Sequence, residues 1–314
     1  MFRARACFRY ISDMSNAIDA VLIAGPTASG KSAVALALAE RLGGMIVNTD
    51  SMQVYREARI LTARPSIEDE ARAPHMLYGH VGVREPYSVG RYQADAAKAL
   101  AKAKRPIFVG GTGLYFTALT EGIAEIPPVP ASIREAVRQK REAMGAEAFH
   151  AELAARDPAS ANLRAGDTQR TLRAMEVLEA TGEPLSYWQT KAGKPVLEGL
   201  KLARFVLAPP RPVLHARIEG RFDAMLKSGA MEEAAGLSGL DPALPAAKIL
   251  GLRELQAVRA GAMDLATATT LAKTATRQYA KRQLTWFRHR MGGWHWLEAQ
   301  DLSNIIPEIL SHLS

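Results

Sequence analysis

The segment that most constrains the fold of this chain is the loop from Gly25 to Ser32, which reads GPTASGKS. It fits the pattern G-x-x-x-x-G-K-[ST] at every fixed position. A short apolar run, AVLIA, precedes the loop, and a helical stretch that ends at Gly43 and Gly44 follows it. A loop of this kind between a strand and a helix binds a phosphate chain. The alternative interpretation is an ordinary glycine-rich turn.

The residue types of this loop explain how it would bind an anion. Glycines allow successive backbone N–H groups to converge on one anion, and the following helix adds the positive end of its dipole. The Lys31 ammonium supplies a full charge, and the Ser32 hydroxyl is a candidate Mg²⁺ ligand. The candidate phosphate-binding residues are Gly25, Pro26, Thr27, Ala28, Ser29, Gly30, Lys31 and Ser32.

Strand and helix patterns alternate through the first part of the chain. Apolar runs at 45–50 and 106–111 follow the first strand, with helical stretches between them. This alternation predicts an α/β fold, a parallel sheet flanked by helices as in P-loop NTPases. After the Pro-rich PPVPAS, residues 133–185 predict only helices. A strand returns in LARFVLAPP at 202–210, and the last long helix is predicted at 265–291.

These changes of pattern predict the domain boundaries. Residues 20–127 form the first part of the core, 128–200 an all-helical insertion, and 201–314 the second part of the core with its C-terminal helices. Residues 1–19 are Arg-rich and match no later pattern, so we expect a disordered N-terminal extension. Three origins stay open for it: an upstream mis-start with Met14 as the true start, a basic arm, or a transit peptide.

Composition narrows the functional classes. No apolar run approaches the roughly 18 residues that span a bilayer, so we expect a soluble protein without a membrane partner. The single cysteine, Cys7, excludes a disulfide framework and fits a reducing cytoplasm. The net charge of +8 favours a polyanionic partner such as nucleic acid, although it also serves solubility. The histidines lack metal-ligand spacing.

Two polar positions lie where the sheet is expected to bind its ligand. Asp50 closes the second strand, where an acid can join a Mg²⁺ shell or act as a general base; otherwise it caps a following helix. Thr112 lies in the glycine-rich turn 110–115, whose glycines permit close approach of a ligand, unless it is simply a tight turn. Further polar donors and an aromatic ring on this edge come from Ser51, Met52, Gln53, Val54 and Tyr55.

Basic residues recur at helical spacing. Arg170 and Arg173 share one face of a helix in the predicted insertion and are candidate RNA contacts. The alternative interpretation is an ordinary solvated basic face. Arg217 and Arg221, four apart, can steer or neutralise a leaving pyrophosphate. The C-terminal run at 277–290 interleaves cations with aromatic rings and suits phosphate contacts; its candidate RNA-binding cations are Lys281, Arg282 and Arg288.

The blocks GPTASGKS, DSMQVYR, the turn at 110–115, QRTLRAMEVLEATGEPLS and RQYAKRQLTWFR occur in this order. The chain thereby resembles the bacterial tRNA dimethylallyltransferase family over about residues 20–296. The loop alone is widespread, whereas DSMQVYR with the TGEPLS and KRQLTWFR blocks is specific. The family's stretch near 248–254 is poorly matched by KILGLRE, where only Gly251 and Arg253 agree, so contacts there are in doubt.

The resemblance implies an activity and a set of roles. The family transfers a dimethylallyl group from its diphosphate to N6 of the adenosine 3′ to the anticodon, and it uses Mg²⁺. It implies a monomer that binds the anticodon stem-loop of tRNA, with Asp50 as the base and Arg217 facing the pyrophosphate. Lys31 and Thr112 join them at the reacting site. The implied tRNA contacts are Asp50, Ser51, Met52, Gln53, Thr112, Arg134, Gln169, Arg170, Thr171, Leu172 and Arg173.

Three other functions remain open from the residues. A P-loop small-molecule kinase shares the loop and the Asp50 position, but it leaves the basic helices unexplained. A prenyltransferase acting on free adenosine nucleotides uses the same chemistry without a long basic surface. A non-catalytic GTPase switch that binds RNA would carry an N-K-x-D motif, which the sequence lacks.

Overall fold

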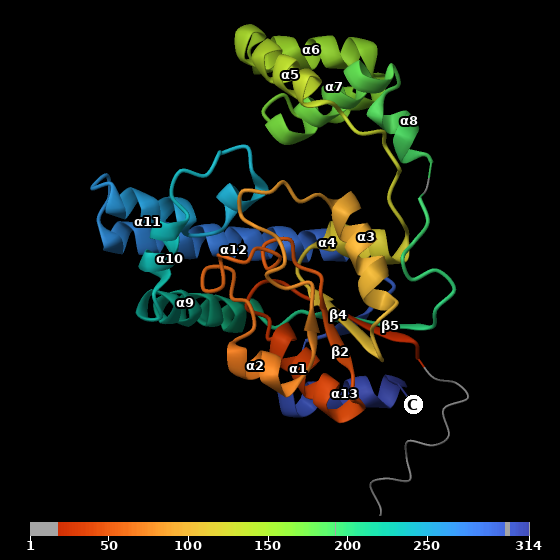
Figure 1. Cartoon of the computed structure of the whole chain (residues 1–314), viewed down its shortest axis with the longest axis vertical. Helices are drawn as coiled ribbons and strands as arrows, with labels where there is room; N and C mark the ends of the chain where they lie inside the picture. The colour runs from red at the N-terminus through yellow and green to blue at the C-terminus, as the bar shows by residue number, and fades with distance from the viewer. Residues whose placement is uncertain (1–17, 192, 299–301, 314) are drawn as a thin grey trace, which may run out of the picture. The chain divides into compact units, whose positions relative to one another are not determined.

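The computed structural model describes residues 18–191, 193–298 and 302–313. The predictions for the extension at 1–19 and for Met14 as the start therefore lie almost wholly outside the described residues. The chain divides into two compact units (Figure 1). One contains the residues up to Phe116 together with those from Leu197 onward, and the other runs from Thr117 to Val196.

The first unit is built on a six-stranded sheet with the order β3-β2-β4-β1-β5-β6, and every neighbouring pair is parallel. The predicted α/β class is therefore confirmed. The sequence did not reveal β3 and β6, because strands of two and three residues are too short to show a pattern. The strands are β1 (Ala20–Ala24), β2 (Met45–Asn48), β3 (His75–Met76), β4 (Pro106–Gly110), β5 (Leu202–Leu207) and β6 (His295–Leu297).

Helices cover this sheet on both faces. Side chains alternate along a strand, so Ile23 packs with α1 and α13 on one face while Leu22 is buried toward the other. None of the helices described is both long and apolar enough to cross a membrane. The helices of this unit are α1 (Lys31–Leu42), α2 (Ile67–Arg72), α3 (Val89–Leu100), α4 (Gly113–Thr120, whose last residues enter the second unit), α9 (Arg211–Lys227), α10 (Ala230–Gly236), α11 (Leu252–Arg259), α12 (Leu265–Arg290) and α13 (Leu302–Leu313).

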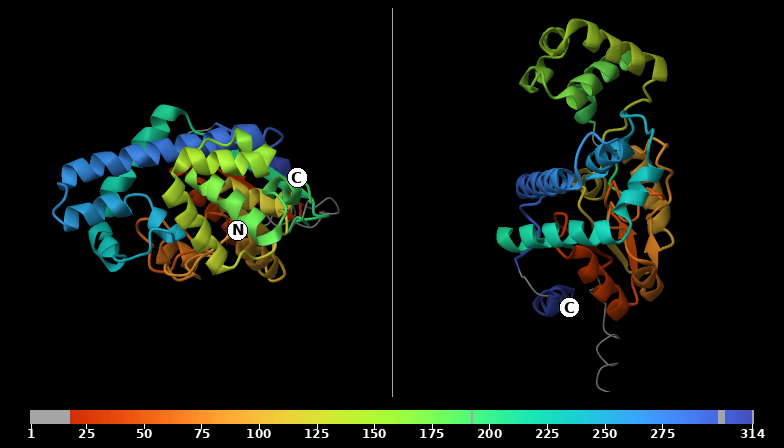
Figure 2. Two further views of the ribbon diagram at one scale, coloured as in Figure 1. Left: turned by 90° about the horizontal axis from the view of Figure 1, so that it is seen from above. Right: turned by 90° about the vertical axis from the view of Figure 1, so that its left-hand side faces the viewer.

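The long helix α12 packs against α9 (Figures 1 and 2). Two cations of α12 join these helices by ion pairs. Lys273 lies 2.7 Å from Asp223, and Arg277 lies 3.0 Å from Glu219. The bounds of α12 match the predicted helix to within one residue, but α13 follows it and was not predicted.

The second unit is helical around a core that includes Phe149 and Met175. Asp167 caps α7 by accepting the Arg170 N–H, and Gly182 ends the helix. The Asp157 carboxylate, which precedes η2, accepts from the hydroxyls of Ser160 and Ser186 and caps no backbone N–H. The helices are α5 (Ala131–Met144), α6 (Ala146–Arg156), the short 3₁₀ helix η2 (Pro158–Asn162), α7 (Thr168–Thr181) and α8 (Leu185–Gln189).

The bounds of this unit, Thr117–Val196, differ from the predicted 128–200. Its two connecting segments lie against each other, which explains the difference. The Val196 N–H donates to the carbonyl of Ala118, and a Cβ on Gly193 would lie 1.9 Å from the carbonyl oxygen of Ile123. The Pro-rich stretch therefore lies inside the unit, so its composition did not mark the boundary.

Candidate active site

The loop between β1 and α1 is curled around its lysine. Ala28 and Gly30 have positive φ, and the Ser29 N–H donates to the carbonyl of Pro26. The Lys31 Nζ donates to the same carbonyl at 3.3 Å, and Lys31 is only 8% exposed. The buried Ser29 Oγ has no hydrogen-bond partner among the residues described. A curled loop with a buried ammonium at a helix N-terminus is suited to binding an anion, and the unpaired Ser29 hydroxyl lies within it.

Lys31, Asp50 and Arg221 act on one another electrostatically. Burial lowers the pKa of Lys31 to about 8, the nearby Asp50 carboxylate opposes this, and Arg221 adds to it. Burial also lowers the pKa of the Arg221 guanidinium, again opposed by Asp50. Two cations and one carboxylate sharing a desolvated region leave net positive charge there, which an anionic ligand would neutralise.

Both predicted arginines of α9 reach this loop from one helix face. Arg217 Nη1 donates to the carbonyl of Ser29 at 3.0 Å, and Arg221 Nη2 donates to the hydroxyl of Thr27. Their spacing of four residues places them one helical turn apart, so they meet the loop at successive points. The sequence could not show this contact, because 188 and 194 positions separate the partners.

Asp50 and Thr112 meet at one corner, beyond the ends of β2 and β4. Asn48, which is fully buried, donates to the Asp50 carbonyl and accepts the Asp50 N–H, each at 2.9 Å. The Asp50 Oδ1 accepts the Met52 N–H at 3.0 Å in a turn, and no helix starts in the stretch described between Ser51 and Ser66. The helix-capping alternative for Asp50 is therefore wrong.

Thr112 binds the segment after Asp50 directly. Its Oγ1 accepts the Ser51 N–H at 2.9 Å and contacts the Ser51 hydroxyl at 3.1 Å. The Tyr279 hydroxyl also bonds Thr112, and burial raises the pKa of Tyr279. Thus α12 and both strand ends supply the polar groups of one corner.

The glycines of the 110–115 turn serve the chain's own packing. A Cβ on Gly110 would lie 2.0 Å from the Thr49 carbonyl oxygen, and one on Gly113 would lie 2.1 Å from the Trp286 ring. On Gly111 it would lie 2.2 Å from Gln283 Nε2. The expectation that these glycines make room for a ligand is therefore wrong, because protein atoms occupy the space. The tight-turn alternative describes the backbone correctly, since β4 passes into α4 here.

A pocket opens beside Asp50 and Arg221, and most of its wall is apolar. Helix α9 supplies Ile218, Phe222 and Met225 beside Arg221, and the segment before α11 supplies Ile249 and Leu250. The apolar residues of α9 were not predicted as site residues: their helical spacing is visible in the sequence, but an apolar helical stripe usually indicates core. The pocket is lined by Thr27, Asp50, Met52, Leu61, Thr62, Ile218, Arg221, Phe222, Met225, Ile249, Leu250, Thr276 and Tyr279.

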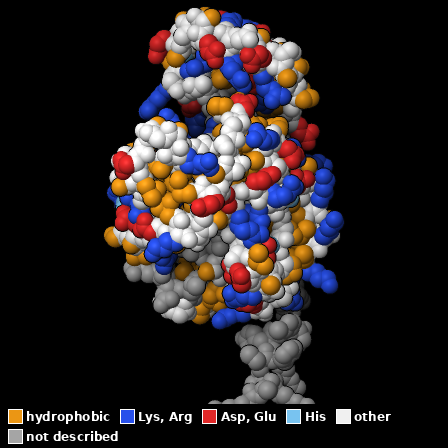
Figure 3. Space-filling view, turned by 60° about the vertical axis from the view of Figure 1, so that its left-hand side comes forward, with side chains coloured by type: hydrophobic (Ala, Val, Ile, Leu, Met, Phe, Trp, Pro, Cys, Tyr) orange, Lys and Arg blue, Asp and Glu red, His pale blue; other side chains and the backbone are white. Residues whose placement is uncertain are grey.

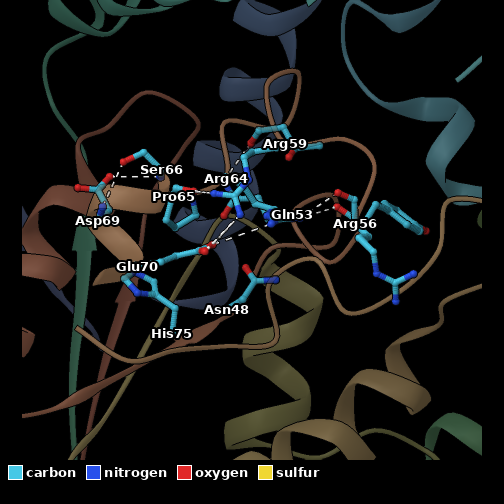
Figure 4. Close-up of polar contacts among 12 residues, drawn as sticks. Asn48, Gln53, Arg56, Arg59, Arg64, Pro65, Ser66, Asp69, Glu70 and His75 are labelled. Carbon is cyan, nitrogen blue, oxygen red and sulfur yellow. Dashed lines mark hydrogen bonds and ion pairs between the residues drawn. The ribbon is translucent and has the colours of Figure 1, made fainter. Parts of the chain in front are cut away.

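One wall of this pocket belongs to a loop that is held by internal polar contacts (Figure 4). Gln53 is buried, and its Nε2 donates to the carbonyls of Thr62 at 2.9 Å and Ala63 at 2.8 Å. The expectation that Gln53, Val54 and Tyr55 add polar donors and an aromatic ring to the ligand-binding edge is therefore wrong, because Gln53 bonds internally and the other two are fully buried. Glu233 on α10 accepts two further N–H groups of this loop, from Ile60 and Leu61, both at 2.8 Å.

The predicted RNA-contacting residues lie in both units. In the helical unit Arg134, Gln169 and Arg170 are exposed, but Thr171 is buried and its hydroxyl bonds back to the Asp167 carbonyl. A side-chain contact from Thr171 to RNA is thus contradicted by its burial. Leu172 and Arg173 are partly exposed, as are Ser51 and Met52. In the first unit Lys281, Arg282, Arg288 and Arg253 are exposed.

Positive charge is not confined to one area. On the face that Figure 3 shows, Lys and Arg side chains are interspersed with Asp and Glu. Arg173, for example, lies 3.9 Å from Glu176, and Arg170 lies 3.5 Å from Asp167. An RNA-binding surface built from these cations would therefore be distributed over several helices.

The fold and the site define a class: an α/β enzyme in which a P-loop, a carboxylate and an apolar pocket converge. The chain belongs to the IPP transferase family, whose model matches residues 53–290, and an isopentenyl transferase model matches residues 18–78. The resemblance inferred from the sequence blocks is confirmed.

Relatives support this assignment across nearly the whole chain. A tRNA dimethylallyltransferase of Nitrobacter hamburgensis is 51% identical over 302 residues, which cover 93% of this chain and 95% of the relative. A tRNA isopentenylpyrophosphate transferase structure from Bacillus halodurans is 31% identical, with a TM-score of 0.66 over 94% of this chain and 95% of its own. A eukaryotic dimethylallyltransferase acting on tRNA gives a TM-score of 0.76 at 26% identity, over 90% of this chain and 74% of its own.

Proposed function

We propose that this chain transfers a dimethylallyl group from dimethylallyl diphosphate to N6 of the adenosine 3′-adjacent to the anticodon in tRNA, releasing diphosphate. The observation that carries the proposal is the apolar pocket between the loop and Asp50. A diphosphate ester with a short hydrocarbon tail matches this combination of anion-binding loop and apolar wall. Membership of the IPP transferase family supports the same reaction.

The reaction requires one bond to form and one to break. N6 of adenine attacks the allylic C1, the C1–O bond to the diphosphate breaks, and the proton on N6 passes to the Asp50 carboxylate. An exocyclic adenine amine is a weak nucleophile, so it needs a proton acceptor nearby. The adenine must also be unstacked from its neighbours before its amine can reach the allylic carbon. Thr112 shares the corner with Asp50 through Ser51, which favours a role in holding the adenosine there.

The leaving diphosphate gains charge as the bond breaks. Lys31 and Arg221 lie beside Asp50 and share a desolvated region, where fixed cations stabilise developing charge more strongly than in water. Arg217 supports the loop at Ser29 and belongs to the same set. The Ser29 hydroxyl is a further donor for the diphosphate.

Mg²⁺ fits the donor set. The described residues hold no group of three or more His, Cys, Asp or Glu that could form a cage, and Ser32 is exposed in the first turn of α1. Mg²⁺ is commonly bound through few protein oxygens, several waters and substrate phosphates. Ser32 would hold the ion beside the diphosphate, where it would neutralise charge on the leaving group.

The helical unit, Thr117–Val196, and the exposed cations of α12 are proposed as the tRNA-binding parts. Arg134, Gln169 and Arg170 supply polar groups there, and Lys281, Arg282 and Arg288 supply charge on α12. The proposal also comprises a monomer acting in the cytoplasm, as the family resemblance and the cysteine content suggest.

The test is to incubate the protein and Mg²⁺ with tRNA and dimethylallyl diphosphate labelled in the prenyl group. We expect label in the RNA, at the adenosine next to the anticodon. Parallel reactions offer AMP as acceptor, and ATP as a phosphoryl donor. Label transferred to AMP but not to tRNA would favour the free-nucleotide alternative, and turnover of ATP without any prenyl transfer would favour a kinase.

A further inference from the structure

Gln283 lies on the buried side of α12 and joins the two halves of the candidate site. Its Oε1 accepts the backbone N–H of Thr27 at 2.8 Å, and its Nε2 donates to the carbonyl of Gly111 at 2.8 Å. The Gln283 side chain is 5% exposed, and its hydrogen bond to Gly111 is buried and thus shielded from water. One amide therefore holds the diphosphate loop with its acceptor and the Thr112 turn with its donor.

The turn is shaped around this side chain. A Cβ on Gly111 would lie 2.2 Å from Gln283 Nε2 and 3.1 Å from Asp50 Oδ2. Gln283 and the Asp50 carboxylate therefore pack against the same glycine. Trp286, one turn further along α12, covers Gly113 in the same way. Helix α12 thus packs against the turn through Gln283 and Trp286, and Gln283 also contacts the diphosphate loop.

Thr27 is anchored from two sides. In a phosphate-binding loop, backbone N–H groups usually turn toward the anion. Here the Thr27 N–H is bonded to Gln283 and the Thr27 hydroxyl accepts from Arg221. This arrangement favours Thr27 as the point where the loop is fixed in place, with the later residues of the loop left to bind the diphosphate.

We propose that Gln283 is a positioning residue that sets the separation between the diphosphate loop and the Asp50–Thr112 corner. The inference rests on the proposed transfer reaction, in which the loop carries the allylic carbon and the corner holds the amine. Reacting atoms must approach to about 3 to 3.5 Å, and a misplacement of about 1 Å costs roughly 10²-fold in rate. A neutral amide suits the role because it donates and accepts at once, which neither a carboxylate nor an ammonium does.

The test compares Q283M, which keeps the length of the side chain without its polar head, with wild-type protein. We expect the single-turnover transfer rate to fall by about 10²-fold while the dissociation constants for tRNA and dimethylallyl diphosphate stay near wild type. The matched control is Q256M. Gln256 also bridges two elements, with Nε2 donating to the carbonyls of Leu237 at 3.0 Å and Ala234 at 3.4 Å. That variant should lose similar thermal stability and keep the transfer rate.

Q283E supplies a second readout. Its carboxylate still accepts from Thr27, but it offers no donor to Gly111 until it is protonated. Its rate relative to wild type should therefore rise as the pH falls. The inference is wrong if Q283M transfers at the wild-type rate, if Q256M loses as much rate, or if the Q283E ratio does not change with pH. A wild-type protein that transfers nothing would instead overturn the proposed function.

Discussion

Arg221 donates a hydrogen bond to the hydroxyl of Thr27, joining α9 to the diphosphate loop across 194 positions of sequence. The same arginine lines the apolar pocket and acts electrostatically on Lys31. A single side chain therefore links the loop, the pocket and the charge that faces Asp50. This link is why a helix distant in sequence belongs to the active site.

Replacing Arg221 by Met should lower the transfer rate by about 10² to 10³-fold, because a fixed cation near the leaving diphosphate is lost. The Michaelis constant for dimethylallyl diphosphate should rise as well, because a cation that attracts the bound diphosphate is removed. Steady-state kinetics with saturating tRNA measure both effects. Arg259→Met, at an exposed arginine on the last turn of α11, is the control and should leave both constants unchanged. Equal effects of the two changes would contradict the role of Arg221.

Asp50→Asn tests the base. The Asn side chain can still accept the Met52 N–H, so the turn should keep its shape, but it accepts no proton at neutral pH. Loss of a general base typically lowers turnover by about 10² to 10⁴-fold. Binding of tRNA, measured by filter retention, should survive. Asp19→Asn, at a carboxylate that accepts the Lys201 N–H far along the chain, is the control. Near-normal turnover of the Asp50 variant would refute the assignment.

The sequence could predict the parts of this protein that rest on local patterns. The loop from Gly25 to Ser32, strands β1, β2, β4 and β5, and the capped helix α7 all carry signals within a few residues. The parallel sheet followed from their alternation. The strands β3 and β6 could not be predicted in this way, since such short segments become strands only by pairing with longer neighbours.

The site was predicted less completely, for a physical reason. Gln53 and Thr171 have polar side chains, which favour a surface position when only the sequence is known. In the structure both are buried and donate hydrogen bonds to backbone carbonyls. Gln283 lies in a basic stretch whose composition favours a solvated surface. It nevertheless binds Thr27 and Gly111, which are 256 and 172 positions away in the sequence. Such roles arise from tertiary contacts, which no spacing along the chain encodes.

Lys31 predicts a pH dependence of diphosphate binding. Burial lowers its pKa to about 8, so the ammonium is charged at neutral pH and loses its proton as the pH rises through that value. Affinity of the free enzyme for dimethylallyl diphosphate should therefore be full below about pH 8 and fall above it. Titration calorimetry across about pH 7 to 9 measures this. Lys31→Met should bind dimethylallyl diphosphate weakly, and its affinity should not decrease as the pH rises above about 8. A decrease that persists in this variant would contradict the assignment to Lys31.

The two substrates should respond differently to salt. Each cation that neutralises an RNA phosphate releases counterions, so tRNA affinity should drop steeply as salt rises, and diphosphate affinity should drop less. Lys281→Ala and Arg288→Ala, both at exposed positions of α12, should each reduce the slope of log affinity against log salt by about one. Equal slopes for tRNA and dimethylallyl diphosphate, or unchanged slopes in both variants, would exclude this helix from the RNA-binding surface.

Met225 tests whether the apolar pocket holds the prenyl tail. It lies four residues after Arg221 on α9, which places it about 6 Å, or roughly one helical turn, further along the helix axis. Met225→Ala should raise the Michaelis constant for dimethylallyl diphosphate by about tenfold, since buried contacts worth about 0.8 kcal/mol per methylene are removed. Met225→Leu conserves volume and should remain near wild type. Affinity for inorganic diphosphate, which has no tail, should be unchanged in both variants. If Met225→Ala weakens inorganic diphosphate as much as the prenyl substrate, the pocket supports the loop and does not receive the tail.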